Sequence, residues 1–87
     1  MSHAQVLFFG RLRELMGSQT MTVDQAFIGR PVSELRLALA RLNDDSQGVL
    51  LHSTVRVAIN KTLLPPGADP LVCAGDEIAF MPPMSGG

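Results

Sequence analysis

Only one stretch of this chain has the period of a long helix, and that single helix limits the folds open to it. Four apolar residues repeat at the spacing i, i+3, i+7 and i+10: Val32, Leu35, Leu39 and Leu42. On a helix they form one apolar stripe. Pro31 suits the first helical turn, where its missing N–H costs nothing, and Asn43 begins a polar end. We therefore predict one amphipathic helix over residues 31–43.

The other patterned stretches have the character of strands. Alternating or β-branched runs predict strands at about residues 4–10, 19–23, 55–60, 62–64 and 77–81. Residues 11–17 suggest a short helical turn, residues 24–30 are irregular, residues 60–61 form a turn and residues 65–70 a loop. The short link between the first two strands favours an antiparallel hairpin.

This order of elements indicates an α+β domain in which one main helix packs on one face of a four- to five-stranded mixed sheet. It matches the ubiquitin-like β-grasp, in which the first and last strands lie side by side and parallel at the sheet centre. We expect residues 1–81 to form this domain and residues 82–87 to form a flexible tail.

Composition excludes several classes of protein. The 87 residues allow one core, and 46% of them are hydrophobic. With a net charge of −1 and scattered basic residues, no nucleic-acid footprint is visible. No apolar stretch approaches the ~20 residues of a membrane span, and no secretory signal opens the chain. The lone Cys73 excludes an internal disulfide. We therefore expect a soluble, cytoplasmic protein.

The strand patterns also leave apolar residues on the face that the helix does not cover. Gln5 should be exposed, which turns Val6 and Phe8 inward and Leu7 and Phe9 outward. In the last strand Glu77 should likewise be exposed. Because side chains alternate along a strand, Met81 then faces outward, and Ile78 and Phe80 face inward. Phe9 and Met81, with Leu63 as a candidate neighbour, would form a surface for protein docking.

The last six residues are Pro82, Pro83, Met84, Ser85, Gly86 and Gly87. The prolines prevent the last strand from continuing as a paired central strand, and the glycines carry no side chain. Extended, the segment reaches roughly 20 Å and is narrow. A frayed end is the simplest alternative, since a terminal Gly-Gly arises by chance in roughly 0.5% of chains.

Several segments together carry a resemblance to a known family: residues 6–14, 34–36, 57–60 and 75–80, and the ending Pro-Pro-x-Ser-Gly-Gly. Over nearly its whole length the chain resembles the MoaD-type sulfur carriers, the small subunits of molybdopterin synthase, in the MoaD/ThiS family. It departs from the pattern at Pro31, where a Ser or Thr helix cap is common, and at Cys73, in a turn that is commonly acidic or lysine-bearing.

The resemblance implies a sulfur carrier in molybdenum cofactor biosynthesis that acts through the carboxylate of Gly87. An E1-like enzyme would adenylate Gly87 with ATP, and a persulfide sulfur donor would displace AMP to leave a thiocarboxylate. The sulfur is then used inside the large synthase subunit. Narrow Gly86 and Gly87 would enter these partners' active sites, while Phe9, Leu63, Met81 and the preceding tail residues Pro82 to Ser85 would contact the partner.

Other functions stay open from the sequence. A ubiquitin-like modifier would use the same activated Gly87 to acylate lysines, and a thiamine-pathway sulfur carrier shares the Gly-Gly ending. A passive interaction domain is a third alternative. His3 and His52 lack a surrounding catalytic constellation, and Cys73 in a turn is most simply structural. The chain is thus expected to be a non-catalytic subunit that binds no cofactor or metal.

Overall fold

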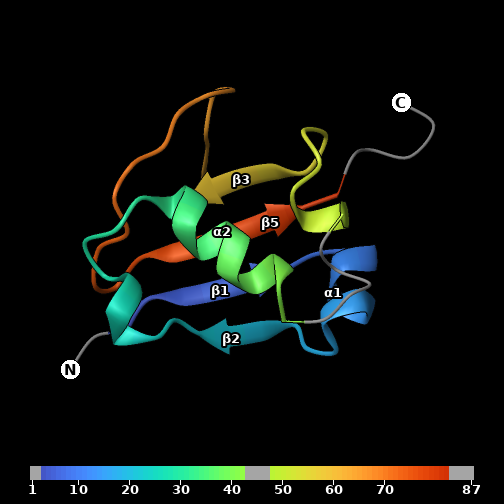
Figure 1. Cartoon of the computed structure of the whole chain (residues 1–87), viewed down its shortest axis with the longest axis horizontal. Helices are drawn as coiled ribbons and strands as arrows, with labels where there is room; N and C mark the ends of the chain where they lie inside the picture. The colour runs from blue at the N-terminus through green and yellow to red at the C-terminus, as the bar shows by residue number, and fades with distance from the viewer. Residues whose placement is uncertain (1–2, 43–47, 83–87) are drawn as a thin grey trace.

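The computed structural model describes residues 3–42 and 48–82, and in this part of the chain a five-stranded mixed sheet carries helices on one face and at one end (Figure 1). The strands are β1 (Gln5–Phe8), β2 (Thr20–Thr22), β3 (Arg56–Ile59), β4 (Thr62–Leu63) and β5 (Glu77–Met81). The helices are α1 (Arg11–Met16), the 3₁₀ helix η1 (Gln25–Phe27) and α2 (Val32–Ala40), and residues 48–50 are also helical.

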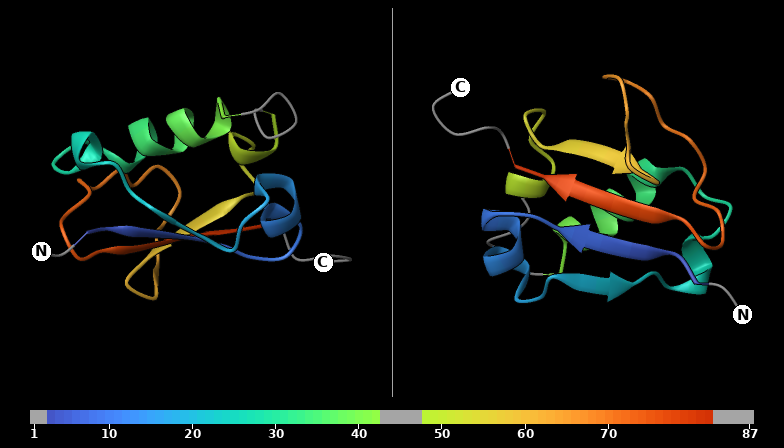
Figure 2. Two further views of the ribbon diagram at one scale, coloured as in Figure 1. Left: turned by 90° about the horizontal axis from the view of Figure 1, so that it is seen from below. Right: turned by 180° about the vertical axis from the view of Figure 1, so that it is seen from behind.

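The strand order is β2-β1-β5-β3-β4, so the last strand lies at the centre of the sheet. β1 pairs with β2 antiparallel and with β5 parallel, and β3 pairs antiparallel with both β5 and β4. The expected hairpin, the parallel first and last strands and the β-grasp topology are confirmed. Figure 2 shows α2 lying across one face of the sheet, while the described part of the chain places no helix on the opposite face.

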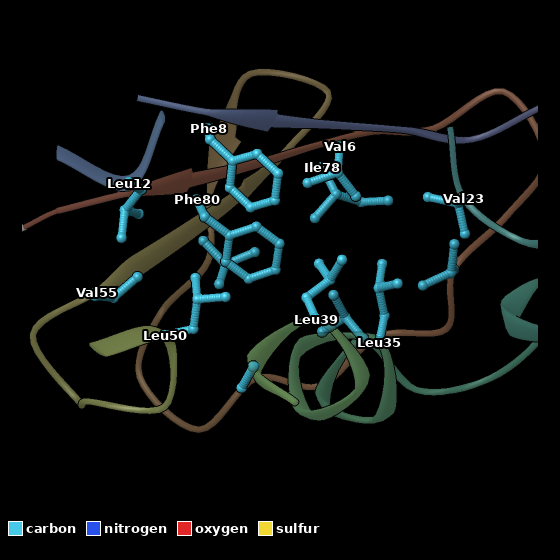
Figure 3. Packing of buried hydrophobic residues seen from close by; sticks show 14 of the residues in the cluster. Val6, Phe8, Leu12, Val23, Leu35, Leu39, Leu50, Val55, Ile78 and Phe80 are labelled. Carbon is cyan, nitrogen blue, oxygen red and sulfur yellow. The ribbon is translucent and has the colours of Figure 1, made fainter. Parts of the chain in front are cut away.

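The core lies between the sheet and α2 (Figure 3). Phe8 of β1 and Phe80 of β5 stack with their ring centroids 6.0 Å apart, and both are buried. Val6 and Ile78 lie beside each other in the same two strands. The predicted inward faces of β1 and β5 are therefore confirmed. These rings and Leu39 of α2 bury the apolar surface that drives folding.

Several predicted boundaries are wrong because tertiary structure ends elements early. The strand predicted over 4–10 ends at Phe8, and the chain then turns through Gly10 at φ 56°. The helix predicted over 31–43 ends at Ala40, so Leu42 leaves the apolar stripe and is 56% exposed. The irregular segment 24–30 contains η1, whose first turn is capped by the Asp24 carboxylate, 2.8 Å from the Ala26 nitrogen.

The start of α2 is capped from a distant loop. Pro31 stands just before the helix in extended conformation, not in its first turn as predicted, and has no side chain that could cap. The carboxylate of Asp69 instead accepts hydrogen bonds from the Ser33 backbone nitrogen at 2.8 Å and the Ser33 hydroxyl at 2.6 Å. Asp69 thus caps the N-terminus of α2 in place of a Ser or Thr side chain at position 31.

Arg36 fixes the segment between α2 and β3, to which the sequence assigned no structure. Its guanidinium donates to the carbonyl oxygens of Leu50 at 2.5 Å, His52 at 2.7 Å and Val55 at 3.0 Å. Burial lowers the pKa of Arg36, yet a guanidinium stays protonated at any physiological pH. These three hydrogen bonds hold the segment that contains Leu50, which is fully buried in the core.

We predict that Asp69→Ala lowers the free energy of unfolding by about 1 kcal/mol, because two hydrogen bonds at the helix start are lost. Urea unfolding followed by circular dichroism measures this. Asp69→Asn is the matched control, since its amide oxygen can still accept from the Ser33 backbone and should keep most of the stability. Equal stability of Asp69→Ala and the unsubstituted chain would rule the cap out.

Candidate functional site

The face of the sheet opposite α2 carries a row of apolar side chains that crosses four strands. Leu7 of β1 pairs with Ala79 of β5, Ala79 with Ala58 of β3, and Ala58 with Leu63 of β4. Paired residues point to the same side of a sheet, so these four lie on one face. The register therefore places Leu63 on the same face as Leu7, where the sequence had it only as a candidate.

Phe9 and Met81 extend this row toward the end of β5. The Phe9 nitrogen donates to the Phe80 oxygen at 3.2 Å, which continues the parallel pairing one residue past β1 and sets Phe9 beside Met81. Phe9 is 45% and Leu63 47% exposed, whereas Ala58 and Ala79 are nearly covered. We call Leu7, Phe9, Ala58, Leu63, Ala79 and Met81 the apolar face.

A basic side chain borders the apolar face. Arg56 pairs across the strands with Met81, and its guanidinium donates to the Leu64 oxygen at 3.0 Å. The far end of the face carries Gln5 and Glu77, which are paired with each other. Sequence reasoning singled out neither Arg56 nor Ala58. The alternation of residues 55–60 could have placed both on the outward face, because Val55, Val57 and Ile59 face inward and the residues between them must face outward.

Pro82, the first residue of the predicted tail, packs against the turn after β1. Gly10 adopts φ 56°, and a Cβ added there would lie 3.0 Å from the Pro82 Cγ. Any side chain at position 10 would therefore push on the root of the tail. The remaining predicted tail residues, Pro83, Met84, Ser85, Gly86 and Gly87, lie outside the described residues.

A hollow of about 240 Å³ adjoins Pro82. Its wall is formed by α1 residues, the segment after residue 47, and Pro82: Arg11, Leu12, Gly48, Val49, His52, Thr54, Val55 and Pro82. Strand alternation turns Met81 to the apolar face and its neighbour Pro82 to the other side. Pro82 therefore stands between the apolar face and the hollow.

The Gly75-Asp76-Glu77 motif lies at the opposite end of β5, where its hydrogen bonds stabilise the fold. The Asp76 carboxylate accepts from the Asn60 amide at 2.9 Å and from the Cys73 backbone nitrogen at 2.9 Å. The Asn60 side-chain oxygen accepts from the Glu77 nitrogen at 3.0 Å. Asn60 itself adopts φ 51°, as a tight turn between β3 and β4 requires. These bonds fix where β5 begins, and Cys73 is exposed beside them.

A larger groove of about 400 Å³ lies between α2, β3 and the loop 64–69. Several of its polar residues are already engaged: Ser33 bonds to Asp69, and Arg36 and Arg56 donate to backbone carbonyls. Its lining shares Val55 with that of the hollow but does not include Pro82. In the described ranges, no three His, Cys, Asp or Glu side chains gather in a way that could hold a metal ion. The best-supported site is therefore the apolar face with the root of the tail.

Comparison with known proteins agrees with the resemblance. Residues 6–87 match the ThiS family. The chain is 39% identical over 82 residues to the molybdopterin synthase sulfur carrier subunit of Haemophilus influenzae, covering 94% of this chain and 96% of that protein. It is 36% identical over 83 residues to the protein of the same name from Escherichia coli, covering 95% and 98%.

A solved structure is also similar. The crystal structure of H. volcanii small archaeal modifier protein 1 superposes with a TM-score of 0.65 at 27% identity, covering 97% of this chain and all of that one.

We predict that Phe9→Asp changes the free energy of unfolding by less than about 1 kcal/mol, because Phe9 lies on the surface and its replacement opens no cavity in the core. Phe80→Ala should cost about 3–5 kcal/mol, because Phe80 is fully buried against Phe8. Urea unfolding of both variants checks this. A large loss in Phe9→Asp would show that Phe9 serves the fold and is not a free surface residue.

Proposed function

The chain belongs to the ThiS family, and we propose on that premise that it is the sulfur carrier subunit of a molybdopterin synthase. Two relatives that bear this name match it over nearly their whole length. The observation that carries the proposal is the central, parallel position of β5, which brings the chain to Pro82 at the border of an exposed apolar face.

The chemistry follows from the terminal carboxylate of Gly87. A carboxylate is a poor electrophile, so its oxygen first attacks the α-phosphorus of ATP in an E1-like enzyme, and pyrophosphate leaves. The acyl adenylate is then attacked at its carbonyl carbon by a persulfide sulfur, and AMP leaves. Cleavage of the resulting S–S bond by a thiol frees the thiocarboxylate, which the large synthase subunit uses to sulfurate its substrate. ATP is bound by the activating enzyme, and the carrier needs no cofactor of its own.

In this proposal the domain binds the partner and the tail carries the reactive carboxylate into the partner's active site, so each step takes place in a partner. The apolar face gives a partner a rigid surface to bind, and Gly86 and Gly87 pass through a channel too narrow for side chains. Docking then makes the reaction of the tail effectively intramolecular. Along the chain, Pro82 to Ser85 connect the domain to these two glycines. The carrier itself is therefore a non-catalytic subunit, for which we propose a cytoplasmic location.

No helix in residues 3–42 and 48–82 is long and apolar enough to cross a membrane.

A second candidate is a protein modifier conjugated to lysines through Gly87. It is favoured by the 27% identity to the small archaeal modifier protein over 97% of this chain. The two relatives at 39% and 36% identity weigh more heavily for the sulfur carrier. The activation of Gly87 is common to both, so the product attached to the chain separates them.

We predict that the chain isolated from its native cell contains a form about 16 Da heavier than the sequence mass, because one terminal oxygen has been replaced by sulfur. Intact-mass spectrometry measures this. Gly86→Val should abolish this form, and the folded domain should keep its unfolding midpoint. Lysine conjugates of higher mass, without the heavier free form, would instead support the modifier.

We also predict that Phe9→Asp and Met81→Asp each weaken binding to the large synthase subunit by at least about tenfold, because a charge would be buried at the interface. Calorimetric titration gives the affinity. Leu71→Asp is the matched control, since Leu71 is 56% exposed and lies outside the apolar face. Equal affinity of all three variants and the unsubstituted chain would show that the partner binds another surface.

A further inference from the structure

The hollow beside Pro82 has a lining suited to an apolar side chain. Leu12 and Val55 line it and are almost fully buried, while Val49 is 42% exposed. Such a concave apolar site with an exposed rim is a typical anchor point for a partner side chain.

The rest of the lining is polar and partly cationic. Arg11 is exposed, and none of the described carboxylates forms an ion pair with it. His52 Nδ1 lies 3.2 Å from the Thr54 backbone nitrogen and 2.8 Å from the Thr54 hydroxyl oxygen. In the part of the chain that the structure describes, the hollow therefore combines a mainly apolar lining with the positive charge of the exposed Arg11.

The length of the tail determines how closely a receiving protein must approach this hollow. Five residues follow Pro82, and fully extended they span about 17 Å. An active site that encloses the last two residues uses part of that length inside its channel. The mouth of the channel must therefore lie near Pro82, and the surface around the mouth meets both sides of this residue.

We propose that the hollow is a second contact site for the large synthase subunit, separate from the apolar face. It takes one apolar side chain of that subunit, with an acidic side chain nearby to pair with Arg11. This inference rests on the proposed function. It assigns Val49 and the helical segment at residues 48–50 to binding, in addition to the role of Leu50 in the core.

The site can be blocked in two independent ways. Val49→Asp places a negative charge at its rim. Gly48→Phe fills it, and an ideal Cβ at Gly48 meets no atom within 4 Å, so the fold has room for a side chain. The matched controls are Leu71→Asp and Ala68→Phe, at exposed positions of the segment between β4 and β5. Figure 1 shows this segment in orange, mostly toward the end of the molecule opposite α1.

Calorimetric titration of each full-length variant with the large subunit tests the proposal. We expect both hollow variants to bind at least about tenfold more weakly than the unsubstituted chain, and both controls to bind within about twofold of it. Unfolding midpoints identify any variant that has lost its fold. If one hollow variant is unfolded, the affinity of the other hollow variant tests the proposal.

Two results would overturn the inference alone: hollow variants that bind as tightly as the unsubstituted chain, or hollow variants that disrupt self-association of the free chain while leaving subunit binding intact. In the second case the occupant is another copy of this chain. Failure of the unsubstituted chain to bind the large subunit would contradict the proposed function itself, and the inference with it.

Discussion

The parallel pairing of β1 with β5 is the constraint on which the rest of this structure depends. It joins the two ends of the domain at the sheet centre and stacks Phe8 on Phe80 at 6.0 Å. Because β5 is flanked by strands on both sides, its end is held by two ladders of hydrogen bonds. Pro82 therefore leaves the sheet from a fixed position, which a terminus on an edge strand would lack.

The same pairing builds the surface around the exit. Each β5 residue brings a neighbour from β1 and from β3 to its own side of the sheet, so Met81 is accompanied by Phe9 and Arg56. The side chains on the α2 side stabilise the fold, and those on the other side form the apolar face, for which we propose a binding role. Because side chains alternate along a strand, β5 contributes to both the core and this face.

Sequence reasoning succeeded where a residue's environment depends on its immediate neighbours. The parity of Gln5 and Glu77 was enough to orient β1 and β5, and the turn at residues 60–61 follows from local preference. It failed where a distant segment decides. The helical stripe suggested that Leu42 is buried, but α2 ends at Ala40. Nothing near Pro31 indicated that Asp69, 38 residues later, would cap the helix.

By itself the sequence determined the fold class and the inward and outward faces of the central strands, and it suggested the chemistry that we propose for Gly87. These inferences depend on period, composition and the identity of residues near the end of the sequence. Only the tertiary structure decided that Leu63 lies in one row with Leu7, that Arg36 clamps residues 50–55, and that a hollow adjoins Pro82. Register between strands and contacts between distant segments arise when the chain packs, and no local pattern encodes them.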